Sequence, residues 1–70
     1  MSTNGREIII LNQDALDCTV TLFTIEGKLL RRLKVLAGHR EVMKVQTGGA
    51  YIVHLQNAFT NDVHKVLVEY

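Results

Sequence analysis

Apolar and polar residues alternate with a period of two along most of this chain, and this alternation constrains the fold more than any other feature. The segment 17–24 alternates Cys18, Val20 and Leu22 with polar or aromatic residues. The segment 50–56 shows the same alternation. Successive side chains of a β-strand point to opposite faces of its sheet, so such segments predict strands with one buried face. We therefore expect an all-β protein.

Turn-forming residues divide this pattern into short strands. Breaks rich in glycine or asparagine recur roughly every ten residues, a spacing typical of an antiparallel sandwich or barrel. The strands that we expect span residues 6–12, 17–24, 28–35, 41–46, 50–56 and 63–70. The last break, at residues 57–62, predicts a hairpin that joins the final two strands.

One segment admits a helical alternative. Four leucines between residues 28 and 36 stand at positions i, i+1, i+4 and i+7, which a helix could place on one face. Gly27 and Gly38 leave only ten residues between them. An isolated helix shorter than about 12 to 15 residues is marginal. We therefore favour a strand here.

Length and composition indicate one small folded domain. The chain has 70 residues, of which 47% are hydrophobic, and a net charge of +1. This balance is typical of a globular domain and gives no reason to expect nucleic acid or an anionic membrane as partner. We assign residues 6–70 to a single sandwich domain and residues 1–5 to a disordered leader. No apolar run reaches the ~20 residues of a membrane span, and we expect no secretory leader.

The residues that could carry catalysis are sparse. Cys18 is the single cysteine, so no internal disulfide forms, and its place in an alternating apolar segment predicts a buried, inert thiol. Ser2 is the single serine, and no nucleophile motif surrounds it. We expect no catalytic residues, no cofactor and no enzymatic activity.

The histidines and the basic residues are the candidate binding groups of this chain. His54 and His64 could face each other across the last hairpin, but a structural zinc site needs four clustered ligands, and we predict no metal site. The basic stretch 30–34 lacks interleaved aromatic residues. This composition favours an edge strand protected by charge over a nucleic-acid surface.

Three short motifs, taken in order, carry a resemblance to a known family. An alternating strand ends in Leu-x-x-x-x-Gly, a Gly-x-Tyr opens the next-to-last expected strand, and a lysine-bearing strand closes the chain. The motif residues are Leu22, Gly27, Gly49, Tyr51, Val53, Lys65, Val66 and Val68. Over residues 6–70 the chain resembles the C-terminal sorting domains of the type IX secretion system of Bacteroidetes, the Por secretion tail family.

The resemblance implies both a fold and a function. It implies a small antiparallel immunoglobulin-like β-sandwich of six to seven strands that catalyses nothing. Such a domain directs a cargo protein, attached N-terminal to it, through the type IX system. The implied partners are the outer-membrane secretion and sortase machinery. The implied location is secreted or on the cell surface, reached through the periplasm and outer membrane.

Two other functions remain open on the residues alone. The domain could be an accessory interaction module, for example an adhesin or a carbohydrate-binding sandwich, which would need exposed aromatic residues. Tyr51 is expected to point inward, with its hydroxyl on a polar partner. Exposure of Phe23 and Tyr70 on one face would favour this alternative. The domain could also be a homodimer, because its edge strands contain no proline to block pairing.

Overall fold

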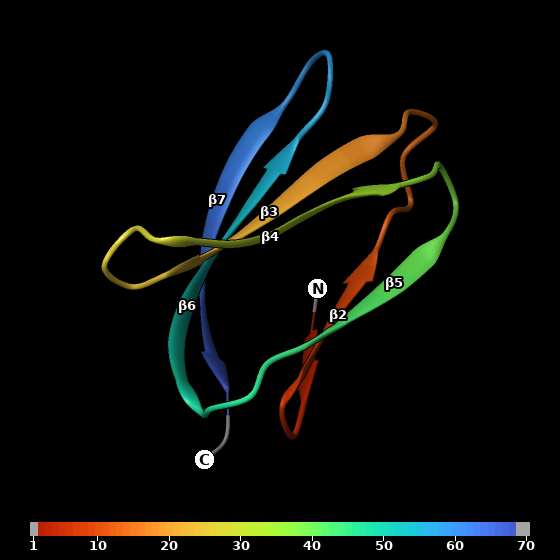
Figure 1. The fold of residues 1–70 in the computed structure, drawn as a ribbon. Helices are drawn as coiled ribbons and strands as arrows, with labels where there is room; N and C mark the ends of the chain where they lie inside the picture. The colour runs from red at the N-terminus through yellow and green to blue at the C-terminus, as the bar shows by residue number, and fades with distance from the viewer. Residues whose placement is uncertain (1, 69–70) are drawn as a thin grey trace.

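The computed structural model describes residues 2–68, which form seven β-strands in two antiparallel sheets (Figure 1). The strands are β1 (Ser2–Asn4), β2 (Glu7–Leu11), β3 (Cys18–Thr24), β4 (Leu29–Val35), β5 (Arg40–Lys44), β6 (Gly49–Gln56) and β7 (Asn61–Val68). One sheet has the order β1-β2-β5 and the other the order β4-β3-β6-β7. The predicted antiparallel β-sandwich is confirmed. No helix within residues 2–68 is long and apolar enough to cross a membrane.

The position of β4 distinguishes this sandwich from an immunoglobulin constant domain. In that domain the fourth strand joins the sheet of the first, second and fifth strands. Here β4 pairs with β3 in the other sheet. A tight turn causes this: the Gly27 N–H donates to the Thr24 carbonyl, and the Thr24 N–H donates to the Lys28 carbonyl, each over 2.9 Å. So short a connection keeps consecutive strands adjacent.

The segment with helical spacing is a strand, as favoured from the sequence. β4 pairs with β3 so that Leu33 lies opposite Val20 and Val35 lies opposite Cys18. Val35 is buried and Leu33 is half-buried, whereas the other leucines of this segment are about half exposed. An edge strand of a sandwich needs only one buried face, and Leu33 and Val35 supply it.

The core lies between the two sheets and is built from alternate residues of the strands. Its members are Ile8, Ile10, Val20, Leu22, Val35, Met43, Val45, Tyr51, Val53, Val66 and Val68. Most are β-branched, and such side chains pack well on a pleated surface. The alternation that predicted the strands therefore also identified their inward faces.

The N-terminus differs from the expected disordered leader. Ser2–Asn4 forms the strand β1, which pairs with Glu7–Ile9 of β2. Gly5 has a φ of 60°, and it opens the two-residue connection between the strands. A glycine at this position suits a hairpin turn that requires positive φ. Gly5, at the first position of this connection, was the sequence feature that could have predicted the hairpin.

Candidate functional site

The motif residues from the sequence converge on one sheet. They lie on β3, β6 and β7 or in the turns at the ends of these strands, and β6 lies between the other two. Leu22 lies opposite Val53, and Tyr51 lies opposite Val66. These four side chains are buried against the second sheet. The fold thus unites motifs that are up to 46 residues apart, from position 22 to position 68.

The glycine of the first motif is required by backbone conformation. Gly27 has a φ of 94°, a region that residues with a side chain rarely adopt. A Cβ atom at this position would meet no atom within 4 Å. The constraint therefore lies in the turn itself and not in packing against a neighbour.

The Gly-x-Tyr motif secures the connection that crosses from β5 to β6. The Tyr51 hydroxyl donates to the Thr47 carbonyl over 2.6 Å, and it lies 3.0 Å from Thr47 Oγ1. The ring is 7% exposed, so the hydroxyl is bonded at the edge of the core as expected. Gly49, with a φ of 136°, starts the strand that carries this ring inward. The motif therefore ties a turn to the core.

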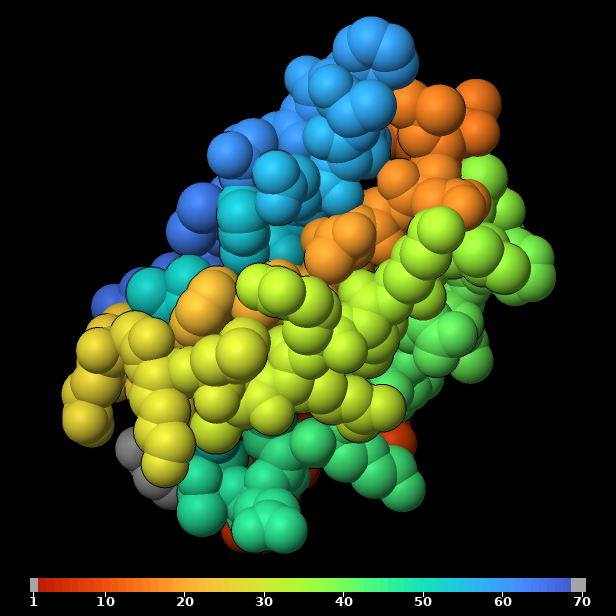
Figure 2. Space-filling view, turned by 45° about the horizontal axis from the view of Figure 1, so that its top comes forward, coloured from red at the N-terminus to blue at the C-terminus, as the bar shows by residue number. Residues whose placement is uncertain are grey.

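The last hairpin presents one face to the core and one to solvent. Val66 and Val68 are buried, whereas Lys65 is exposed opposite Ile52 on the outer face. The hairpin turn is fixed by Asn57, whose Oδ1 accepts the N–H groups of residues 59 and 60, each over 2.8 Å. The Asn57 N–H also donates to the Thr60 carbonyl over 3.0 Å. This turn projects at one end of the molecule (Figure 2, light blue).

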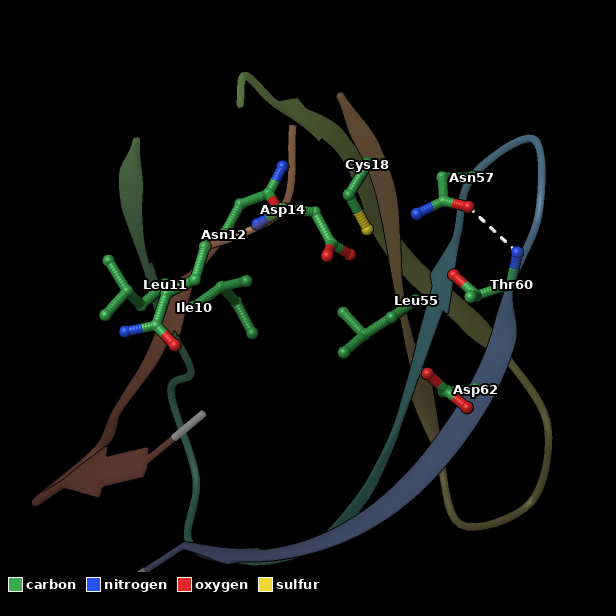
Figure 3. A pocket seen from close by; sticks show the side chains of 10 residues that line it. Ile10, Leu11, Asn12, Asp14, Cys18, Leu55, Asn57, Thr60 and Asp62 are labelled. Carbon is green, nitrogen blue, oxygen red and sulfur yellow. Dashed lines mark hydrogen bonds between the residues drawn. The ribbon is translucent and has the colours of Figure 1, made fainter. Parts of the chain in front are cut away.

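A hollow of about 270 Å³ opens between the end of β2 and the start of β7 (Figure 3). Its lining is Ile10, Leu11, Asn12, Gln13, Asp14, Cys18, Leu55, Asn57, Thr60 and Asp62. Cys18, which was predicted to be buried, is only half-buried and lies on this wall. Alternation correctly predicts that Cys18 points inward. Cys18 is only half-buried because it lies at the end of β3, beside the opening of the hollow.

A second hollow, of about 420 Å³, lies at the edge of the sandwich near Tyr51. Arg31 and Lys44 contribute positive charge to it, and Leu22 and Leu30 contribute apolar surface. It combines the motif residues Leu22 and Tyr51 with two basic side chains. Among residues 2–68, no carboxylate or histidine lines it.

The histidine geometry considered from the sequence is wrong. His54 lies opposite Val63 and His64 lies opposite Val53, so the two rings point to opposite faces of the sheet. His54 instead hydrogen-bonds Asn61 Oδ1. Within residues 2–68 no cluster of three or more His, Cys, Asp or Glu side chains could hold a metal ion.

Asp17 is held by contacts with two neighbouring residues. A hydrogen bond from the Ala37 N–H lowers the pKa of the Asp17 carboxyl below its ordinary value, and Lys34 also lowers it. The Ala37 N–H donates over 2.9 Å and Lys34 Nζ lies 3.4 Å away. These contacts join the start of β3 to β4 and to the connection that follows it. Asp17 therefore supports the fold and is not one of the motif residues.

The aromatic face considered for carbohydrate binding is partly outside the described residues. Phe23 is half-buried on the outer face, opposite Ile52. Tyr70 lies outside residues 2–68, so its place beside Phe23 stays a prediction. Among the described aromatic residues, Phe59 is the one that is largely exposed, at the tip of the last hairpin.

Comparison with known proteins gives one relationship. The chain is 38% identical over 69 residues to the minor fimbrium subunit Mfa5 of Porphyromonas gingivalis. It is similar to one segment of a fimbrial subunit. The match takes in 97% of this chain and 6% of that protein, so the chain spans a small fraction of its relative's length. No family model matches the chain, and no solved structure matches it.

Proposed function

We propose that this domain is a non-catalytic sorting domain, which directs an attached cargo protein through the type IX secretion system to the cell surface. The similarity to a fimbrial subunit supports a place in a surface protein, because fimbriae are surface structures. The matched segment is 6% of that subunit, a proportion that suits a small module borne by a much larger protein.

The observation that carries the proposal is the convergence of the three motifs on one sheet. Leu22, Tyr51 and Val66 form a buried layer across β3, β6 and β7. Gly27 and Gly49 supply the turn conformations at the ends of these strands. A set of residues that lies scattered in the sequence thereby defines one surface, whose outer side includes Lys65.

The buried and exposed motif residues would have separate roles. Val66 and Val68 hold the last strand against the core, and Lys65 is free to contact a partner from the solvent face. The proposed partner is the outer-membrane secretion and sortase machinery. An exposed positive charge on a held strand can orient a docking partner without adding much to stability.

The test is an export assay with the domain fused to the C-terminus of a periplasmic reporter in a host that has a type IX system. We expect the unchanged domain to carry the reporter to the cell surface and Lys65→Ala to lower surface display several-fold. Lys28→Ala, in the β3–β4 turn, is the matched control and should leave display unchanged. Circular dichroism of each purified domain verifies that it is folded. Display that persists after deletion of residues 66–70 would refute the proposal.

A second function is favoured by the relative itself. The domain would be an accessory interaction module of a fimbrial or other surface protein, with no role in export. The exposed apolar side chains of the last hairpin, Phe59, Val63 and Leu67, support contact with a protein. In the same assay this function predicts that the deletion leaves export intact and weakens assembly of the surface protein.

A further inference from the structure

The most exposed large apolar side chains all belong to one short segment. Phe59 is 84% exposed, Leu67 is 73% exposed and Val63 is 65% exposed, against 39–51% for the other exposed large hydrophobic residues among those described. The three follow one another at intervals of four residues. Val63 and Leu67 lie on the outer face of β7, opposite His54 and Ala50 of β6. Apolar groups concentrated on one strand and on the turn that leads into it indicate an interaction surface.

β7 is also a free edge. Its bonded neighbour is β6, and within residues 2–68 no other strand pairs with it. The Asn57–Thr60 hydrogen bond closes the hairpin and sets the alternation of the ladder. Residues 62, 64, 66 and 68 therefore bond to β6, while the N–H and C=O groups of residues 61, 63, 65 and 67 point to the open side. A second strand can pair there.

We propose that a second copy of this domain pairs with this edge, antiparallel, around a two-fold axis at Val63. The segment 59–67 is complementary to itself about that residue. Val63 meets Val63 of the other copy, and Leu67 lies level with Phe59 of the turn that leads into the other copy's β7. Asp62 meets His64. Apolar groups thus face apolar groups, and an acid faces a base.

The backbone supports the same register. Residues 61, 63 and 65 carry the outward N–H and C=O groups, and in this register they oppose residues 65, 63 and 61 of the other copy. These are the hydrogen-bonded pairs of an antiparallel ladder. Asp62 and His64 then form the non-bonded pair, in which side chains approach most closely. Two four-stranded sheets would join into one sheet of eight strands.

Neighbouring registers are worse. Moving the second copy by two residues in one direction sets Asp62 against Asp62. Moving it the other way sets His64 against His64 and Val63 against Lys65. Two carboxylates in direct opposition destabilise the first of these strand pairs, and in the second an apolar residue opposite a lysine gains little. The sequence of β7 therefore selects the register centred on Val63.

The first test measures association of the unmodified chain by sedimentation equilibrium. One copy has a mass of 7.9 kDa, and we expect the apparent mass to rise with concentration toward twice that value. Val63→Lys places two lysines opposite each other and should raise the dissociation constant at least about tenfold. Leu36→Lys, at an exposed leucine on the β4–β5 connection, should leave it unchanged. A chain that stays monomeric at millimolar concentration would overturn the proposal.

The second test fixes the register by disulfide trapping in a Cys18→Ala background. In this register the two Val63 Cα atoms lie about 5.5 Å apart, within the disulfide range of about 4.4 to 6.8 Å. The two Leu67 Cα atoms lie eight residues out of register, about 26 Å apart. Val63→Cys should therefore oxidise to a linked dimer and Leu67→Cys should not. Equal crosslinking of both variants, or crosslinking at Leu67 alone, would overturn the register.

The third test addresses the charged pair. Asp62→Lys should weaken association several-fold, because a lysine then faces His64. Adding His64→Glu restores opposite charges and should recover the original dissociation constant. A double variant no stronger than Asp62→Lys alone would overturn the pairing of these residues. All three tests use the isolated chain and measure no export, so their outcome is independent of the proposed sorting function.

Discussion

The positions of single side chains in this domain are determined by backbone conformation or by one hydrogen-bond partner. Alternation predicted that Tyr51 points inward, and the structure confirms it. The partner of its hydroxyl, Thr47, could not be predicted, because it depends on how the crossing from β5 to β6 turns back on itself. Cys18 shows what alternation cannot predict. Alternation gives the face of the sheet to which a side chain points, but not whether the opposite sheet extends far enough to cover that side chain.

The first prediction concerns the Tyr51 hydroxyl. Tyr51→Phe keeps the ring in the core and removes the bonds to the Thr47 carbonyl and hydroxyl. We expect the free energy of unfolding to fall by about 0.5 to 1.5 kcal/mol, the net contribution of a typical hydrogen bond. Denaturant unfolding measures it. Tyr51→Ala, which also leaves a cavity, should cost about 3 to 5 kcal/mol, by analogy with Phe. Equal stability of Tyr51→Phe and the unchanged chain would show that the hydroxyl bonds add nothing.

At the scale of elements, strand existence was predictable and the partners of strands were less so. The six strands expected from alternation are all present within a few residues, and the segment 28–35 is a strand despite its helical spacing. β1 was missed because Ser2–Asn4 has no apolar residue to alternate. Its signature lay in Gly5, the first residue of the turn that follows it. Turn chemistry is thus the better predictor for strands that contribute nothing to the core.

The second prediction concerns the link between β3, β4 and the connection that follows β4. The pKa of Asp17 is lowered, first by the Ala37 N–H and also by Lys34. A lowered pKa in the folded state means that the ionised carboxylate stabilises the fold at pH values above the unfolded pKa. This contribution is lost as the pH falls from about 4 through the lower folded pKa.

The variant Asp17→Asn isolates that contribution. An amide can still accept the Ala37 N–H, but it does not titrate. As the pH falls through this acid range, the free energy of unfolding of Asp17→Asn should therefore decrease less than that of the unchanged chain. Unfolding curves from pH 7 to pH 2 measure the effect, which should be small because Asp17 is exposed to solvent. Asp14→Asn is the control, an exposed carboxyl in the loop before β3. An unchanged acid decline in Asp17→Asn would refute the assignment.

At the scale of the molecule, the two-sheet architecture was predictable and the distribution of strands between sheets was not. Alternation defines which face of a strand is buried, but it is the same for a strand in either sheet. β4 joins β3 because its connection is a tight turn, and this gives sheets of three and four strands. The pairing register between strands decides which side chains share a face, and the register of β6 with β7 places His54 and His64 on opposite faces. The strand registers likewise bring the motif residues together.

The last prediction concerns the terminal strand as part of the whole fold. Deleting residues 66–70 removes Val66 and Val68 from the core, where they are 7% and 4% exposed. Full burial of each such side chain contributes about 1.5 to 3 kcal/mol, and a domain is stable by only about 5 to 15 kcal/mol. The deletion also removes the β7 partners of Gly49, Ala50 and Tyr51, the first three residues of β6. We expect the shortened chain to unfold or aggregate, seen as loss of the cooperative unfolding transition.

Lys65→Ala provides the contrast to this deletion. Its side chain is exposed on the outer face, so the substitution should change the free energy of unfolding by less than about 0.5 kcal/mol. A shortened chain that still unfolds cooperatively would show that residues 1–65 suffice for the fold. A folded Lys65→Ala domain that fails in export would separate recognition of β7 from its role in stability. The two variants together therefore distinguish a strand that holds the sandwich closed from a strand that is also recognised.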